Sequence, residues 1–440
     1  MLNRMKLLLL VLGACSLASA GPMRAGFAKT DVTPRERVTM GGYDLRDAPS
    51  DGIHGNDKLY VRCLALHDGS RKLLFVEADV IMIREQDEFR QRISKATGIP
   101  VSNILVGDAH NHAAPSPGPK GETNWERAFG AAMIETARQA LANLQPVLLA
   151  AGDGRSRIAM NRRQVQPGDR DSFLTFDEND VSQSFGKAKT DSPVKVHEFG
   201  GVMRLGANPG GPIDDAVQIV RLDTAAGKPL AVMIHYACHG TSLGGRNAKI
   251  SGEWMGRMQE YVEKLVPGVG AIYVQGAAGD INPRVVGGLD GNPDDVNTTW
   301  ALGEEIGREV VRVFGTLKPT AWDASIEVES KDIELPRTYR ELFKDFRDTV
   351  VHTPTTAVRI GDLMWVTFPG ELFHSIGMKV KAASPSTHAY LMGYTNGYIG
   401  YFPEQQAFAE GGYEPASSHL DPTAERVYLR EIGELLQRFH

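Results

Sequence analysis

The sequence predicts an α/β fold in which helices flank a mixed central β-sheet. Short apolar runs rich in Val, Ile and Leu recur along the chain, and longer segments with helical periodicity lie between them. Strands and helices that alternate at this spacing are typical of a buried sheet covered by helices. The chain has 440 residues, of which 42% are hydrophobic and 23% charged, so a globular protein with a sizeable core is expected.

The individual elements follow from these runs. The strands are expected at Leu59–Leu66, Lys72–Ala78, Ile104–Val106, Leu230–Tyr236, Ala271–Gln275 and Leu363–Phe368. The helices are expected at Trp125–Leu144, Glu253–Leu265, Trp300–Leu317 and Ala424–Phe439. The last helix follows Asp421-Pro422-Thr423, which supplies a capping residue and a proline near the first turn. Residues 166–195 and 287–297 are polar or Gly-rich and are expected to form surface loops. Because no linker divides the chain, we predict one catalytic domain over residues 21–440.

Residues 1–20 have the pattern of a secretory signal peptide. Arg4 and Lys6 precede an apolar run, and Ala18-Ser19-Ala20 offers a small-residue cleavage site. A secreted or periplasmic protein is therefore predicted. The segment ending at Cys15 also resembles a bacterial lipobox, so lipid anchoring through Cys15 is the alternative. No later stretch is apolar for long enough to cross a bilayer as a helix.

Charge and cysteine content exclude two classes of protein. The formal net charge is −6, whereas binding to nucleic acid needs a basic surface. Beyond the leader only Cys63 and Cys238 remain, which rules out a disulfide scaffold.

Two histidines follow the strand expected at 104–106. Residues 107–115 read GDAHNHAAP, so His110 and His112 lie two apart where the strand ends. Zinc favours imidazole nitrogen, and both rings could turn towards one centre. One histidine could bind the metal while the other relays a proton. The alternative is a pair of partly buried structural histidines.

A second histidine segment, HYACHGTSLG at 235–244, also follows an apolar strand. His239 lies beside a glycine turn and is better placed than His235 to leave the core. The same segment matches the GxSxG pattern of serine hydrolases, with Ser242 at its centre. That pattern requires a helix directly afterwards, and residues 245–249 have the composition of a loop. A serine hydrolase therefore stays as an alternative.

Three further segments carry candidate polar groups. Small residues lead to Asp280 in QGAAGDINP (275–283), so Asp280 could orient a histidine or simply close a turn. Glu371 emerges from an apolar strand through Pro-Gly, so it could bind a metal or begin a helix. Residues 396–401 (NGYIGY) and 411–414 (GGYE) interleave aromatic residues with glycine, as pocket linings often do. The residues alone thus offer His110, His112, His239 and Glu371 as a metal site at strand ends.

Taken in this order, the segments resemble the neutral/alkaline non-lysosomal ceramidase family. The resemblance runs from GFAKTDVTP at 26–34 to about residue 418. In that family the HxH, HGTS, PGE and NxYxxY segments build a zinc centre that hydrolyses the amide of ceramide. The resemblance implies Zn²⁺ as cofactor, with His110, His239, Glu371 and Tyr401 as its ligands and His112 as the neighbouring catalytic histidine. Asn161-Arg162 is similar to the start of the family's NRSP segment, which implicates Arg162 in activity.

The chain departs from the family pattern in several places. Arg163 and Gln164 replace the Ser-Pro of NRSP, and Asn282 replaces the serine of the GDxSPN segment. Asparagine cannot act as a nucleophile, but its amide can donate a hydrogen bond to an oxyanion. The family's additional C-terminal domain is also expected to be missing. Both features weigh against a long-chain ceramide as the natural substrate.

The mechanism that this reading predicts is amide hydrolysis by a zinc-activated water. His112 would exchange protons with the water or the leaving amine, while Arg162 and Asn282 would hold the oxyanion. The leading substrate is an N-acyl amide such as ceramide, cleaved to sphingosine and a fatty acid, and a lipid substrate would bring peripheral contact with a membrane. One alternative is a zinc hydrolase of another small amide or ester, such as an N-acetylated sugar or peptide-like metabolite. The other is a non-catalytic binding protein of the same fold.

Overall fold

The computed structural model describes residues 22–43, 46, 48–167, 201–287, 295–338 and 348–439. The predicted leader with Cys15, residues 168–195 of the first predicted loop and residues 288–294 of the second lie outside this range.

The largest element of the described structure is a nine-stranded mixed sheet. Its main path runs β10 (Gly270–Gln275), β9 (Pro229–Tyr236), β8 (Ala216–Thr224), β5 (Gln145–Arg155), β1 (Arg24–Asp31), β2 (Tyr60–His67), β3 (Lys72–Ala78) and β4 (Ile104–Asp108), and β12 (Thr320–Ala321) pairs with β5. The two outer pairs, β9 with β10 and β3 with β4, are parallel, and the strands between them are antiparallel. β5 pairs with β1 only at Gln145 and Pro146, and its remaining residues pair with β8.

The ends of β4 and β9 lie close together. The segments that follow these strands meet in a parallel bridge between Asn111 and Gly240. The side chain of Gln275, at the end of β10, donates to the carbonyls of Ala109 and Cys238. Two histidine-bearing segments that are far apart in sequence are thereby placed side by side.

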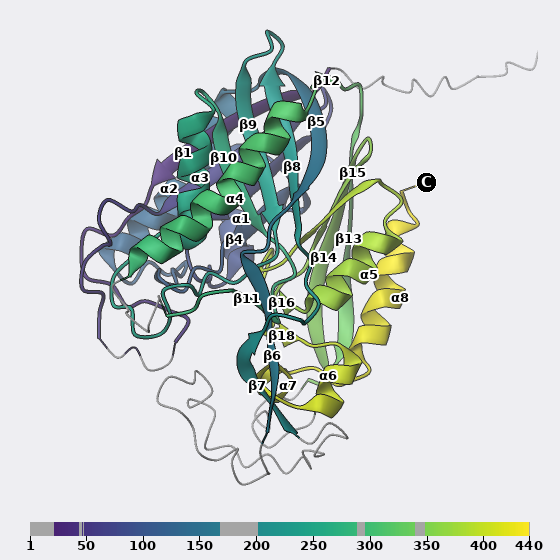
Figure 1. The fold of residues 1–440 in the computed structure, drawn as a ribbon. Helices are drawn as coiled ribbons and strands as arrows, with labels where there is room; N and C mark the ends of the chain where they lie inside the picture. Colours follow the sequence, from purple (N-terminus) through teal and green to yellow (C-terminus); the bar gives the residue numbers. More distant parts are fainter. Residues whose placement is uncertain are drawn as a thin grey trace, which may run out of the picture.

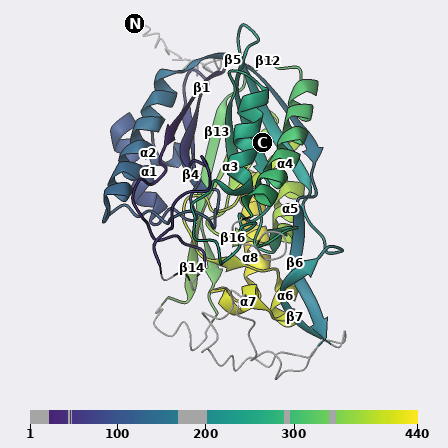
Figure 2. The same cartoon turned by 60° about the vertical axis from the view of Figure 1, so that its left-hand side comes forward.

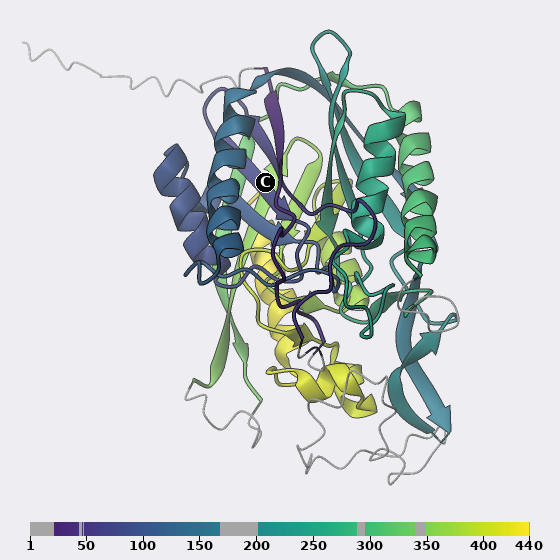
Figure 3. The same cartoon turned by 90° about the vertical axis from the view of Figure 1, so that its left-hand side faces the viewer.

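Both faces of this sheet are covered. Along β3, Leu74, Val76 and Ala78 face a core shared with helices, whereas Leu73 and Phe75 face a second sheet. The helices on the first face are α1 (Gln86–Thr97), α2 (Asn124–Ala142), α3 (Glu253–Leu265) and α4 (Val296–Thr316). Figure 3 shows them as two pairs side by side, with α1 and α2 in blue and α3 and α4 in green.

The second sheet has four strands and its own helical layer. Its order is β13 (Ile326–Pro336), β14 (Val350–Ile360), β15 (Leu363–Thr367) and β17 (His388–Met392). Its outer face packs against α5 (His374–Ala383) and α8 (Ala424–Leu436), with Phe368, Ile376 and Tyr428 in the shared core. The molecule is therefore layered as helices, sheet, sheet and helices (Figure 1).

Smaller elements lie at one end of the two sheets. A three-stranded sheet is formed by β11 (Ile281–Pro283), β6 (Ala159–Pro167) and β7 (Gly201–Asn208), and a parallel pair by β16 (Glu371–Leu372) and β18 (Tyr401–Phe402). The short helices α6 (Gln405–Glu410) and α7 (Tyr413–Ser417) also lie here, whereas η1 (Val101–Asn103) directly precedes β4. In Figures 1 and 2, β6, β7, β16, α6 and α7 gather around one end of the large sheet.

The predicted fold class is confirmed, and each predicted strand and helix is present with ends that differ by a few residues. Among the described residues, no helix combines the length and the apolar character needed to cross a membrane.

Candidate metal centre

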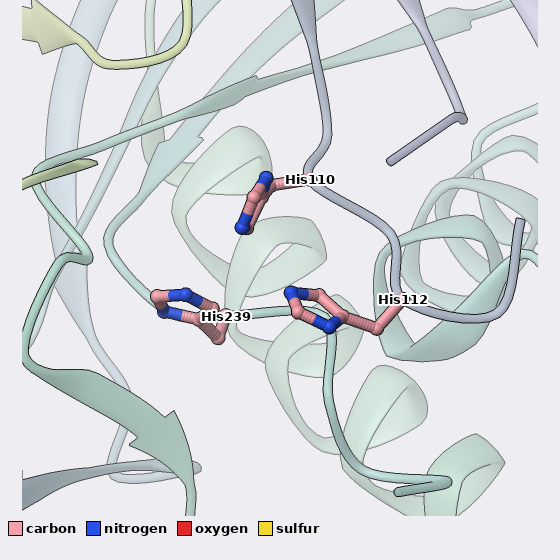
Figure 4. Close-up of side chains that lie close together, drawn as sticks. All are labelled: His110, His112 and His239. Carbon is pink, nitrogen blue, oxygen red and sulfur yellow. The ribbon is translucent and has the colours of Figure 1, made fainter. Parts of the chain in front are cut away.

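Three histidines from two loops converge where the strands of the large sheet end. His110 and His112 follow β4, and His239 follows β9. One ring nitrogen of each lies within 4.8 Å of the others, and all three side chains are almost fully buried. Figure 4 shows the rings turned towards a common centre. The two predicted histidine segments are thus brought together.

His110 is held with one ring nitrogen facing the centre. Its Nδ1 lies 3.0 Å from the carbonyl of Ile81, which can only accept, so Nδ1 is the donor and Nε2 is the nitrogen left to face the centre. Nε2 lies 3.5 Å from Oε2 of Glu371. The backbone of His110 adopts φ of 52°, a left-handed conformation that is uncommon outside glycine and often found at functional sites.

His239 is oriented in the same way. Its Nδ1 donates to the carbonyls of Ala278 at 2.7 Å and Ile281 at 3.0 Å, and its Nε2 lies 3.0 Å from Oε2 of Glu371. Burial, followed by the charge of Arg162, lowers the pKa of His239 to about 4 despite the opposing effect of Glu371. At neutral pH the ring is therefore neutral, as a metal ligand must be.

Glu371 completes a set of three acceptor atoms. Burial would raise the pKa of this carboxyl, but His110 and His239 hold it well below its usual range, so it is ionised. Two imidazole nitrogens and a carboxylate oxygen, the atom types that zinc prefers, therefore converge on one point. The separations of 3.0 and 3.5 Å fit a tetrahedral zinc ion, whose ligand atoms lie about 3.3 Å apart when each bond is about 2.0 Å.

The strand that carries Glu371 is packed tightly against the loop after β10. A Cβ atom on Gly279 would lie 2.4 Å from the carbonyl oxygen of Glu371, and the amide of Gly279 donates to Leu372 at 2.9 Å. Gly279 in QGAAGDINP therefore allows the backbone of this loop to approach the backbone of β16 closely. Asp280 does orient a histidine, as the sequence suggested, but that histidine is His374, with Nδ1 2.6 Å from Oδ2.

His112 lies beside the three acceptor atoms and has no hydrogen-bond partner for either ring nitrogen among the described residues. Its ring centre is 4.8 Å from that of His110, and the ring of Tyr43 meets it edge-on at 4.9 Å. Burial, together with the two neighbouring histidines, lowers the pKa of His112 well below its usual range. A neutral ring with unpaired nitrogens can accept a proton.

Arg162 reaches the centre at His239. Its guanidinium contacts Nε2 of His239 at 3.2 Å through Nη1, Tyr401 at 3.0 Å through Nη2 and Glu414 at 2.8 Å through Nε. Burial alone would lower the pKa of Arg162, but Tyr401, Glu414 and Glu371 together raise it. The group is a permanent buried cation next to the predicted ligands.

Asn282 is in reach of the same guanidinium. Its Oδ1 accepts from Arg162 at 3.3 Å and from Thr241 at 3.3 Å. The NH₂ group of Asn282 has no hydrogen-bond partner among the described residues, so it is free to donate to a substrate.

Tyr401 lies beside Glu371, since β16 and β18 pair these two residues directly. Its hydroxyl is bonded to Arg162, and in the described structure it makes no hydrogen bond to the histidines or to Glu371. The tyrosine that does bond Glu371 is Tyr398, which donates to Oε1. The sequence marked Tyr398 only as part of an aromatic segment and assigned it no role.

Ser242, the centre of the GxSxG match, is buried away from this cluster. Its hydroxyl bonds the carboxylate of Glu253 and lies 2.8 Å from Oγ1 of Thr299.

Glu414, which bonds the guanidinium of Arg162, was not predicted as a site residue, although it belongs to the GGYE segment.

Comparison with known proteins supports the resemblance to ceramidases. No family model matches the chain. The chain is 21% identical to neutral ceramidase A of Dictyostelium discoideum over 360 residues. The aligned region covers 74% of this chain and 46% of that protein. The chain thus spans about half the length of this curated relative.

Solved ceramidase structures share the fold. The neutral ceramidase of Pseudomonas aeruginosa superimposes with a TM-score of 0.74 at 18% identity over 95% of this chain and 74% of its own. A ceramidase structure described as complexed with C2 gives 0.73 at 18% identity, over 95% and 75% of the two chains. In sequence and in fold, the chain is similar to neutral ceramidases, and the predicted resemblance is confirmed.

Proposed function

We propose that this protein is an exported zinc-dependent amidohydrolase that cleaves an N-acyl amide, with a ceramide-like lipid as its leading substrate. The observation that carries the proposal is the convergence of Nε2 of His110, Nε2 of His239 and Oε2 of Glu371, three atoms of the types that bind zinc. Tyr401, next to Glu371 on paired strands, is proposed as the fourth ligand. The similarity to neutral ceramidases supports the amide substrate and the lipid class.

Zinc bound there would polarise the amide carbonyl and lower the pKa of a water molecule towards neutrality. The chain's own residues provide the rest. His112 is neutral and unpaired, so it can take a proton from the attacking water and return it to the leaving amine. Arg162 contacts Nε2 of His239 and Oδ1 of Asn282, so its guanidinium and the NH₂ group of Asn282 can stabilise the developing oxyanion.

A second candidate is a zinc hydrolase of another small amide or ester. Asn282 favours it, because an asparagine replaces the serine of the family pattern and changes the group that faces the substrate. A binding protein without catalysis is disfavoured, since the complete acceptor set and an unpaired base lie together.

Chelation and metal analysis test the proposal. Treatment with dipicolinate is expected to reduce hydrolysis of N-acyl substrates at least about 10³-fold, and Zn²⁺ is expected to restore it. Purified wild type should hold one zinc, His110→Ala and Glu371→Ala none. His112→Ala should keep zinc and lose activity, and the exposed His352→Ala serves as the control. Activity that survives chelation but is abolished by a serine-directed phosphonate would overturn the proposal. A panel of ceramides, N-acetylated sugars and O-acyl esters distinguishes the first two candidates.

A further inference from the structure

Tyr398 combines an exposed ring with a fully engaged hydroxyl. The side chain is 40% exposed, yet its hydroxyl donates to Oε1 of the buried Glu371. The carboxylate oxygen accepts in this bond, so the phenol is the donor.

The loop that carries Tyr398 is anchored to β4, the strand that leads to His110. The amide of Asn396 donates to the carbonyl of Val106 at 2.8 Å, and its Oδ1 accepts from the amide of Val106 at 3.0 Å. The amide of Gly397 donates to Gln86 at 2.8 Å. Tyr394 and Asn396 adopt positive φ angles of 54° and 66°, which non-glycine residues rarely do. The position of Tyr398 is therefore fixed by a strained, well-bonded loop.

The two oxygens of Glu371 consequently have separate tasks. Oε2 faces His110 and His239, whereas Oε1 is occupied by Tyr398. Resting on the metal centre proposed above, we infer that Tyr398 is a positioning residue that holds Glu371 as a one-oxygen ligand. By keeping Oε1 away from the metal, it tightens zinc binding and leaves room for a substrate oxygen. Groups that orient a metal ligand in this way commonly contribute 10- to 100-fold in metal affinity.

Tyr394 provides a matched control on the same loop. Its ring stacks on His110 with centres 4.2 Å apart, closer than the 6.5 Å of Tyr398. Its hydroxyl is buried and has no hydrogen-bond partner within the described part of the chain. Tyr394→Phe and Tyr398→Phe thus each remove one hydroxyl near the same histidine, and only one of the two removes a bond to Glu371.

The test is the affinity for Zn²⁺, measured by competition with a chromophoric chelator. Tyr398→Phe is expected to bind zinc about 10- to 100-fold more weakly than wild type, Tyr394→Phe within about twofold, with unchanged thermal unfolding in both. Tyr398→Ala should match Tyr398→Phe, because the hydroxyl rather than the ring carries the effect. If wild type binds one zinc and Tyr398→Phe binds it equally well, the inference is overturned while the metal centre stands. If wild type binds no zinc, the proposed function itself fails.

Discussion

Two consecutive arginines share one carboxylate beside the candidate metal centre. The register of β6 and β7 shifts between Asn161 and Arg163, so Arg162 lies in an irregularity of the β-bulge kind. Such an irregularity re-aims side chains, and here both guanidiniums reach Glu414, one on each oxygen, at 2.8 and 2.9 Å. Buried arginines need a paired charge, and Glu414 is only 1% exposed.

Glu414→Gln is expected to lower kcat/KM about 10- to 100-fold. The change removes the charge-assisted bond to Nε of Arg162, worth about 1.5–3 kcal/mol, and frees the guanidinium to leave the position from which we propose that it stabilises the oxyanion. The measurement is steady-state hydrolysis of an N-acyl substrate, with zinc content and thermal unfolding recorded for each variant. Glu410→Gln is the control, since Glu410 bonds Arg163 but not Arg162. Equal losses in the two variants would mean that Glu414 only stabilises the fold.

At the scale of elements, the start of α3 holds the loop that presents His239. Glu253, the first residue of α3, has a positive φ of 57°, and its carboxylate accepts from Ser242 and from the amide of Leu243 at 2.8 Å. The indole of Trp254 donates to the carbonyl of His239 at 2.9 Å. The HGTS segment is thereby fixed by a helix terminus, and its serine belongs to that scaffold.

Ser242→Ala is therefore expected to destabilise the protein by about 1–3 kcal/mol, because the buried carboxylate of Glu253 loses the hydrogen bond that Ser242 donates to it. Its kcat should stay within a few-fold of wild type, since the hydroxyl faces Glu253 and Thr299 instead of the histidines. Denaturant unfolding and N-acyl hydrolysis measure the two effects. Ser251→Ala is the matched control, because Ser251 is equally buried and bonds the carboxylate of Asp57. A folded Ser242→Ala that loses activity about 10³-fold, beside an active Ser251→Ala, would restore the serine hydrolase.

The predicted elements have a continuous apolar pattern, and several of the elements that were not predicted are polar. β13 (IEVESKDIELP) has mostly polar residues and a half-exposed face, and β14 contains Pro354. α1 is charged throughout, so its few buried side chains give a weak helical period. β13 and β14 are stabilised by packing against the rest of the fold, and the local sequence pattern does not reveal that packing.

The candidate site divides in the same way. His110, His239 and Glu371 follow apolar strands, and their chemistry can be read from the residues. The parts that could not be predicted depend on pairings between distant segments: Tyr398 with Glu371, and Glu414 with Arg162. An irregular register at Arg162 and positive φ angles at Tyr394 and Asn396 leave no reliable mark in the sequence.

At the scale of the whole molecule, the centre lies where the two sheet layers join. His110 and His239 extend from the large sheet, whereas Glu371 and Tyr401 belong to the chain that forms the second layer. The layers are joined there by backbone bonds such as Gly393 to Gln275, at 2.9 Å, and by the buried pair of Asp280 and His374. The acceptor set exists only when the layers are correctly packed.

The Asp280–His374 pair predicts how this junction depends on pH. Burial would lower the pKa of His374, but Asp280, followed by Glu404 and Asp214, raises it above its ordinary value. A folded-state pKa above the unfolded one means that the proton stabilises the folded protein. This contribution is complete below the unfolded pKa of about 6.5 and is lost as pH rises through the folded value.

The expected result is a gap in unfolding free energy between wild type and His374→Asn that is widest near pH 6 and narrows as the pH is raised to 9. Asparagine can still donate a hydrogen bond to Asp280 but carries no charge, so the difference between wild type and His374→Asn reports the effect of the positive charge on His374. Denaturant titrations at fixed zinc concentration measure the gap. His352→Asn is the control: His352 and Asp332 form a pair of almost the same length, 2.7 Å against 2.6 Å, but both are more than half exposed. Solvent screens such a pair, so its removal should change stability little at any pH. A gap for His374→Asn that widens towards pH 9, or one that matches His352→Asn, would show that protonated His374 does not hold the two layers together.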